Sequence, residues 1–184
     1  MSEDTIRAGG DGRLTLCGEH RGRFCVFGDG ILMKKDNNYD EMKAVIADLE
    51  SDDKVQEMKE YVQHGKVSTY DHCRNVAKLS YDIDRMLHLK CDLKVLLTGA
   101  MLHDFYLYDW HNDDGGTHRL HGFTHAKTAA EKAKKRFDID KKTGDVISSH
   151  MWPLNPEKIP KSKEAWVVCI ADKCASLYET VFRR

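Results

Sequence analysis

The 184-residue sequence has few prolines, no long apolar run and no excess of charge of either sign. Its three prolines all fall between residues 153 and 160, so proline interrupts no helix elsewhere in the chain. No stretch approaches the roughly 18 apolar residues that span a bilayer, and residues 1–13 are too polar for a signal peptide. We therefore expect a cytoplasmic protein without a membrane partner.

The charge and cysteine patterns exclude two further classes. With 29 Lys+Arg against 30 Asp+Glu, the chain lacks the basic excess that duplex nucleic acid selects in its partners. The six cysteines form no C-x-x-C pair, which disfavours a zinc knuckle and favours reduced thiols. A chain of this length can bury roughly 70% of its unfolded surface, so it needs no metal to build a core. A metal found here would serve chemistry.

From residue 39 onward, apolar residues recur with helical spacing. The predicted helices cover about residues 39–50, 52–63, 69–88, 92–106, 123–137, 141–151 and 162–182. Residues 14–34 resemble two short strands around Gly28-Asp29-Gly30, the only β element that the sequence predicts. The sequence thus predicts an all-α bundle of about six to seven helices at residues 39–184, after a tail and hairpin-like segment at residues 1–38.

Histidine is the residue type in excess, with ten in the chain and six of them between His103 and His150. Helical spacing places several of these side chains on apolar helix faces. His72, for example, lies four residues before Val76, and Asp172 shares a face with Val168 and Ala175. The inward polar residues are His72, His103, Asp104, His125, His150 and Asp172.

Inward polar side chains are costly unless they are satisfied. One such histidine is usually a hydrogen-bonded core residue, but six of these groups from five helices, with few inward basic partners, favour a metal site. Imidazole and carboxylate suit iron, manganese, zinc, nickel and cobalt alike. We expect divalent transition-metal ions, and two of them if Asp104 bridges.

These residues resemble the H…HD…D signature of the HD-domain superfamily of metal-dependent phosphohydrolases, which has an all-helical fold. Asp71-His-Cys-Arg-Asn-Val-Ala is similar to the first motif, Leu102-His-Asp to the doublet and Ile170-Ala-Asp-Lys to the last motif. His125 with Ala129 and Ala130, and Ser149-His150, resemble the additional histidines of the dinuclear subgroup. The similarity extends over about residues 67–180 and implies an HD-domain-like bundle with six metal ligands.

The resemblance also implies roles. A first ion would be held by His72, His103, Asp104 and Asp172, and a second by Asp104, His125 and His150. A hydroxide bridging the ions would attack a phosphomonoester, a nucleotide or a related phosphorylated small molecule. Besides Asp104, the loop histidines His118 and His121 are candidate catalytic residues that orient substrate or protonate the leaving group, or else they are solvated. Lys173 either contacts phosphate or forms a structural ion pair.

Other functions stay open at this stage. Phe105-Tyr106-Leu107 departs from the small residue, glycine and lysine of many dinuclear members, which disfavours a cyclic-dinucleotide phosphodiesterase. The six ligands also resemble those of mixed-valence diiron oxygenases in the superfamily, and a metal or nucleotide sensor with little turnover is a third hypothesis. Residues 108–122 and 152–161 are the loops expected to shape the pocket. Their tryptophans, Trp110 and Trp152, either stack on a base or cap the core, and core packing is the favoured interpretation. The sequence leaves the oligomeric state open.

Overall fold

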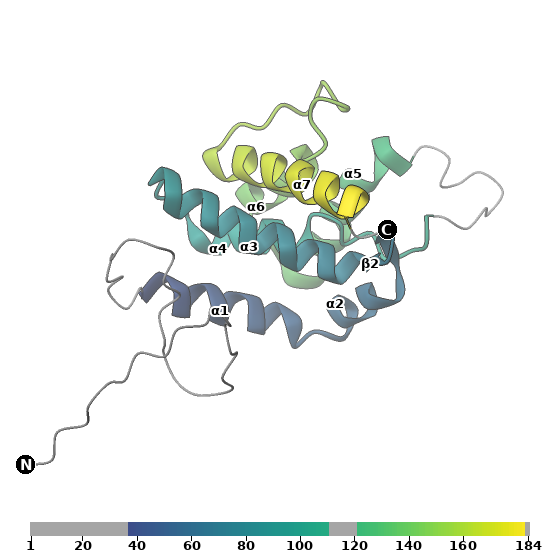
Figure 1. Ribbon diagram of the computed structural model, residues 1–184, viewed down its shortest axis with the longest axis horizontal. Helices are drawn as coiled ribbons and strands as arrows, with labels where there is room; N and C mark the ends of the chain where they lie inside the picture. The colour runs from purple at the N-terminus through teal and green to yellow at the C-terminus, as the bar shows by residue number, and fades with distance from the viewer. Residues whose placement is uncertain (1–36, 111–120, 183–184) are drawn as a thin grey trace, which may run out of the picture. The chain divides into compact units, whose positions relative to one another are not determined.

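The computed structural model describes residues 37–110 and 121–182, which contain seven α-helices, one 3-10 helix and one antiparallel pair of strands (Figure 1). The prediction of an all-α bundle is confirmed. The elements are α1 (Asn37–Glu50), α2 (Asp53–Glu57), η1 (Met58–Glu60), β1 (Val62–His64), β2 (Val67–Ser68), α3 (Thr69–Leu87), α4 (Leu93–Leu102), α5 (His121–Phe137), α6 (Lys141–Ser149) and α7 (Lys163–Phe182).

Side chains that precede the helices fix where several of them begin. Ser68 accepts a hydrogen bond from the backbone N–H of Asp71 at the start of α3, and Asp92 and Asp140 do the same for α4 and α6. At its other end, α3 stops at His88, which has a left-handed backbone with φ of 52°. These caps set the register of the helices that carry the inward polar residues.

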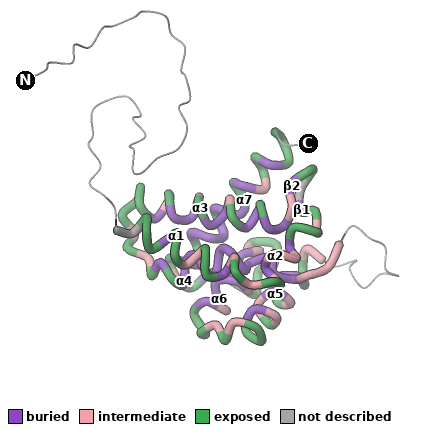
Figure 2. The backbone as a smooth tube through the Cα atoms, turned by 90° about the horizontal axis from the view of Figure 1, so that it is seen from below, coloured by how far each residue is buried: buried purple, intermediate pink, exposed green. Residues whose placement is uncertain are grey.

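Helix α4 lies in the middle of the bundle and determines where the site forms. Every residue of α4 except Lys94 is buried, and the helix packs against α1, α3, α5, α6 and α7. Figure 2 shows the buried residues gathered where these helices meet. Because other helices surround α4, its C-terminal end lies in the interior of the bundle. His103 and Asp104 therefore follow α4 inside the protein.

One sequence prediction is wrong at residues 52–63. Instead of one helix, the chain forms α2 and η1 and then turns into the hairpin of β1 and β2, in which Val62 pairs with Ser68. Gly65 makes the turn with a φ of 58°, a conformation that glycine adopts without strain. The hairpin brings Gln63 into the interior, where it is buried beside Asp104.

The predicted hairpin at residues 14–34 lies outside the described residues, and the division of the chain at residue 38 stays a prediction. In the described part of the chain, no helix combines the length and the apolarity that crossing a membrane requires.

Candidate metal centre

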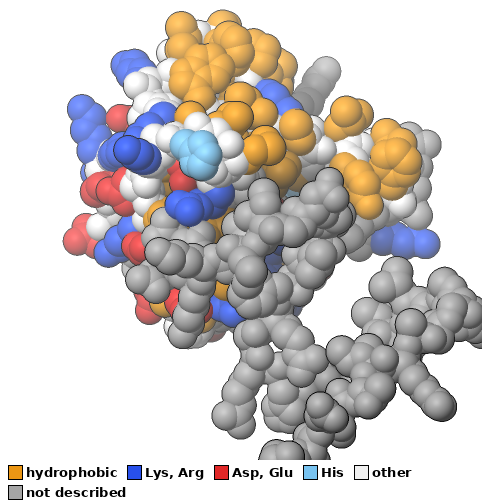
Figure 3. Space-filling model, turned by 60° about the vertical axis from the view of Figure 1, so that its left-hand side comes forward, with side chains coloured by type: hydrophobic (Ala, Val, Ile, Leu, Met, Phe, Trp, Pro, Cys, Tyr) orange, Lys and Arg blue, Asp and Glu red, His pale blue; other side chains and the backbone are white. Residues whose placement is uncertain are grey.

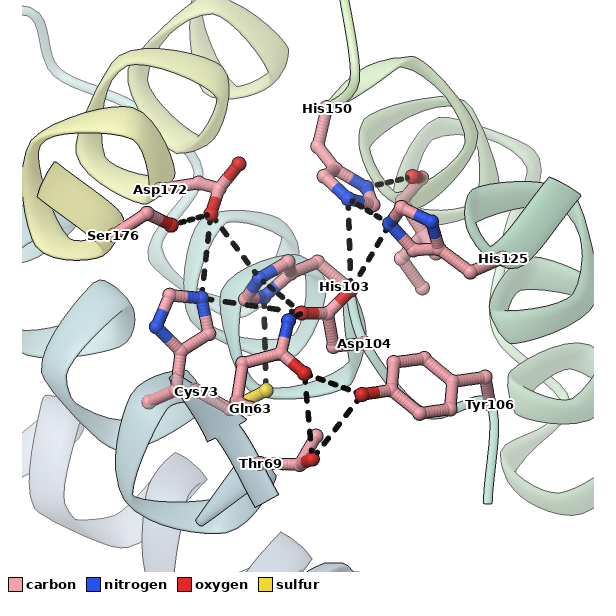
Figure 4. A network of polar contacts seen from close by, with 12 residues as sticks. Gln63, Thr69, Cys73, His103, Asp104, Tyr106, His125, His150, Asp172 and Ser176 are labelled. Carbon is pink, nitrogen blue, oxygen red and sulfur yellow. Dashed lines mark hydrogen bonds and ion pairs between the residues drawn. The ribbon is translucent and has the colours of Figure 1, made fainter. Parts of the chain in front are cut away.

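Six side chains that the sequence placed on inward faces meet in one buried cluster. They come from α3, from the turn after α4, from α5, from the residue after α6 and from α7. All six are buried, with exposed fractions of 7% or less. In Figure 4 the carboxylate of Asp104 lies at the centre, between the rings of His103, His125 and His150. The cluster consists of His72, His103, Asp104, His125, His150 and Asp172.

The two oxygens of Asp104 divide the cluster into two half-sites. Oδ2 faces the first half-site, 3.4 Å from His103 Nε2 and 3.9 Å from His72 Nε2. Asp172 Oδ1 completes that half-site, 3.2 Å from His72 Nε2 and 3.8 Å from His103 Nε2. Oδ1 of Asp104 faces the second half-site, 3.3 Å from His125 Nε2 and 3.6 Å from His150 Nε2.

Every histidine of the cluster has an acceptor at its outer nitrogen. Nδ1 of His103 lies 2.7 Å from the carbonyl of Ala100, and Nδ1 of His150 lies 2.7 Å from that of Ile147. The two other contacts join His125 Nδ1 to the His121 carbonyl at 2.7 Å and His72 Nδ1 to Glu179 Oε2 at 2.8 Å. A carbonyl or carboxylate can only accept, so the proton of each neutral ring belongs on Nδ1. This assignment leaves the Nε2 lone pairs directed at the centre, as metal ligation requires.

The inner atoms fit a cation better than they fit one another. His103 Nε2 and Asp104 Oδ1 are buried without a hydrogen bond, and His125 Nε2 lies 3.0 Å from His150 Nε2. Two neutral rings that both carry their proton on Nδ1 would face each other there with two lone pairs. A divalent cation between acceptors of this kind satisfies all of them at once. Nitrogen and oxygen donors in this proportion suit a first-row transition metal.

The directions of the pKa shifts indicate that the first half-site favours positive charge. Burial alone would lower the pKa of His72, but its hydrogen bonds to Asp172 and Glu179 raise that pKa to about 10. Burial opposes ionisation of Asp104 too, yet His103 and His125 hold its pKa well below the usual range. Burial and the nearby charge of His103 lower the pKa of His150 to about 3, which keeps this ring neutral. A metal that binds here displaces protons from the first half-site.

Two buried residues that the sequence analysis did not single out support the ligands. Glu179 accepts from His72 Nδ1 and, at 2.7 Å, from Asn75 Nδ2. Gln63 Nε2 donates to Asp104 Oδ2 at 2.6 Å, and the hydroxyl of Tyr106 donates to Gln63 Oε1. These contacts fix the orientation of one ligand in the first half-site and of the shared carboxylate.

The second half-site opens into a pocket of about 850 Å³. Asp104, His125, His150 and Asp172 reach its surface, whereas His72 and His103 do not line it. Trp110, Met151, Pro153 and Leu154 form apolar parts of its wall, and Gln63, Lys173 and Ser176 supply further polar groups. The pocket therefore reaches both histidines of the second half-site, but only Asp172 and the shared Asp104 of the first.

Of the other residues that the sequence suggested for the site, His121 and Lys173 line the pocket, and one falls outside the described residues. His121 lines the pocket but is not part of the cluster: its ring stacks between Trp110 at 5.0 Å and His125 at 4.5 Å. Its Nδ1 lies 3.0 Å from the hydroxyl of Tyr108. His118 lies outside the described residues. Lys173 Nζ lies 3.9 Å from Asp172 Oδ2 and donates to the carbonyl of His150 at 2.8 Å.

Comparison of the sequence with models of known protein families identifies the family of this chain. The sequence model of the HD domain matches residues 69–177, which is more than half of the chain. The chain therefore belongs to the HD-domain family, whose members are mostly metal-dependent phosphohydrolases. Neither the curated proteins nor the solved structures contained a match. The matched region begins at the first residue of α3 and covers all six residues of the cluster.

Proposed function

We propose that this protein is a metal-dependent phosphohydrolase that hydrolyses a phosphoester of a small molecule at a two-ion site. The observation that carries the proposal is the convergence of four Nε2 atoms and two carboxylates in one buried cluster that a pocket reaches at His125, His150, Asp104 and Asp172, with every Nδ1 held by an acceptor. His72, His103, Asp104 Oδ2 and Asp172 would hold one ion. Asp104 Oδ1, His125 and His150 would hold the other.

Bound divalent ions would polarise phosphoryl oxygens and provide a nucleophilic water near neutral pH. The protein's own part is to exclude bulk water from the ligands and to orient the phosphate. Its buried rings and carboxylates have little freedom to reorganise, because each is tied to a backbone or side-chain partner. Such preorganisation is the main way in which proteins stabilise developing charge.

Two pocket residues fit roles toward the substrate. Lys173 carries a positive charge at the rim, and its contacts with the His150 carbonyl and Asp172 direct it toward the floor of the pocket. It can neutralise a phosphate oxygen. The imidazole of His121 lines the pocket beside the second half-site, so in its protonated form it can give a proton to the leaving oxygen while its Nδ1–H donates to the hydroxyl oxygen of Tyr108.

The test begins with elemental analysis of the purified chain. We expect about two transition-metal ions for each chain, and hydrolysis of some phosphomonoesters, nucleotides or cyclic nucleotides with the metals found. Asp172→Ala should lose this hydrolysis, whereas Asp82→Ala, which removes an exposed carboxylate of α3, should retain it. Hydrolysis that persists in Asp172→Ala would contradict the proposal.

An oxygen-free control separates hydrolysis from oxidation. The proposed reaction needs no dioxygen, so the rate of phosphoester hydrolysis should be the same in air and under nitrogen. If substrate is consumed only in air, and only by protein whose iron is half reduced, the protein is an oxygenase and the proposal is wrong. If no phosphate ester is hydrolysed although two ions are bound, a sensor role is favoured.

A further inference from the structure

Helix α7 presents two faces of different character. Its inner face carries Asp172 and Glu179 into the metal centre. Its outer face is apolar along nearly the whole helix, with residues recurring every three to four positions as on one side of a helix. Leu177 and Phe182 are exposed to 67% and 72%. The large hydrophobic residues of this outer face are Trp166, Ile170, Leu177, Tyr178, Val181 and Phe182.

This pattern is unlike that of a helix built to face water. Helix α5 shows the usual solvent face, because its exposed positions include Lys127, Glu131 and Lys134. On α7, the one exposed charged residue between Trp166 and Phe182 is Lys173. Figure 3 shows hydrophobic side chains running from the top of the view toward its right-hand side, and charged side chains mostly on the left.

Lys173 does not interrupt the apolar stripe. Its Nζ donates to the carbonyl of His150 at 2.8 Å and contacts Cys169 Sγ at 3.4 Å, so its charge is directed toward the pocket. Trp152, which packs edge-to-face against Trp166 at 5.0 Å, extends the apolar surface beyond the start of the helix.

The area of the stripe is slightly below that of one side of a standard protein interface and above that of most apolar patches on monomers. Because large apolar and aromatic side chains have about 150–250 Å² each, the exposed parts of the six residues amount to about 600–700 Å². The largest apolar patch on an ordinary monomer is about 300–600 Å², and a standard interface buries about 800 Å² on each partner. With the half-buried Trp152 added, the stripe comes close to the area that each partner of a standard interface buries.

The stripe is also complementary to itself. Cys174, which is exposed, lies midway between Trp166 and Phe182. If two copies of α7 cross in opposite directions about a two-fold axis at Cys174, Trp166 of one copy and Phe182 of the other lie at the two flanks of the same end of the contact. Ile170 then approaches Tyr178. A symmetric pair thus covers both halves of the stripe with large apolar side chains.

We propose that a second copy of this chain docks on the outer face of α7, and that the protein is a symmetric dimer with Cys174 of both copies near the two-fold axis. The dimer places the interface on the same helix that carries Asp172. The proposal rests on the exposed residues of α7 and is independent of the reaction.

Mass measurement on the full chain tests the dimer. Light scattering behind size exclusion should give twice the chain mass of 21.1 kDa at tens of micromolar protein. Leu177→Glu and Ile170→Glu should each give a monomer, with the dissociation constant raised about 100-fold or more because an unpaired carboxylate is buried twice. Both side chains are exposed, so the fold should be kept, as circular dichroism would show. Tyr39→Glu is the matched control: it removes a comparably exposed aromatic side chain from α1, which packs on α4, and should leave the dimer intact.

Cross-linking tests the position of the axis. A short bismaleimide should join two wild-type chains through Cys174, and Cys174→Ser should abolish that product while remaining dimeric.

A wild-type monomer at these concentrations would overturn the proposal. If deleting residues 1–36 turned that monomer into a dimer, the N-terminal segment would be the occupant instead. Binding of the monomer to lipid vesicles would assign the stripe to a membrane. A dimer that both Glu variants leave intact would also refute the α7 interface.

Discussion

The two half-sites of the metal centre share Asp104 but differ in the groups behind their histidines. In the first half-site, His72 is held by the carboxylate of Glu179, and Asp172 adds a second ligand carboxylate. In the second half-site, His125 and His150 are held by backbone carbonyls and share only Oδ1 of Asp104. The first half-site is therefore the more anionic of the two.

The two half-sites also differ in how far their histidines lie from the pocket. His72 and His103 do not line the pocket, whereas both histidines of the second half-site do. A carboxylate behind a histidine makes the ring a stronger ligand, and distance from the pocket slows exchange with solvent. We infer that the first half-site would bind an ion more tightly than the second, and that an ion in the second half-site would be the one to contact a substrate and to exchange.

The largest loss of metal and activity is expected when the carboxylate common to both half-sites is removed, because both half-sites then lose a ligand. Asp104→Ala should lose both ions and all hydrolytic activity, because each half-site then keeps only its own histidines and, in the first, Asp172. Elemental analysis would measure the loss, and circular dichroism would show whether the helices remain. An unchanged content of two metals would disprove the shared ligand.

Single histidine substitutions should separate the half-sites. His125→Ala should retain about one ion for each chain, in the first half-site, whereas His72→Ala should weaken that half-site and leave less total metal. Titration with a chelator measures both. If His72→Ala retained more metal than His125→Ala, the second half-site would be the tighter of the two.

The neighbouring His121 provides the control for that pair. It stacks on His125 but lies outside the cluster, so His121→Ala should keep its metal and lose turnover. If metal content persisted in His125→Ala and fell in His121→Ala, His121 would be the ligand of the second half-site.

Glu179→Gln should distinguish the half-sites without removing a ligand. The amide can still contact His72 but carries no charge, so affinity for the first ion should fall about 10- to 100-fold while that for the second is unchanged. Calorimetric titration of metal-free protein would resolve two binding steps. Asn75→Ala is the control, since it removes the other partner of Glu179 and keeps the carboxylate. Equal losses at both steps would show that Glu179 does not act through His72.

How much of this site the sequence predicts depends on where each residue lies. The six inward residues are predictable because long amphipathic helices set their faces by period alone, and a polar group on an apolar face needs a partner. Glu179 carries the same signal, four residues after Ala175 on the face of Asp172, but it lies near the end of the helix, where no buried residue follows it in the described part of α7 to mark its position as inward. Gln63 gives no such signal. It becomes buried only because residues 62–68 form a hairpin, and strand pairs this short have too little sequence to be distinguished from a helix end.

The smallest expected effect concerns the spacing between the half-sites, which depends on the close approach of α4 and α6. A Cβ added at Gly99 would lie 2.6 Å from Cγ1 and 3.1 Å from Cβ of Val146, so this contact must shift, and we expect part of the shift to be a movement of α6 away from α4. Because α4 leads to His103 and Asp104 while α6 leads to His150, that movement separates His150 from Asp104 and spares the contacts of His72. Gly99→Ala should lower the free energy of unfolding by about 1–3 kcal/mol, as overpacking of a core does. It should also weaken binding of the second ion several-fold more than binding of the first.

Gly144→Ala is the matched control, since a Cβ there meets nothing within 4 Å. Thermal melts and the two-step metal titration measure the two effects, and an equal shift of both binding steps would mean that α6 does not set the geometry of the second half-site.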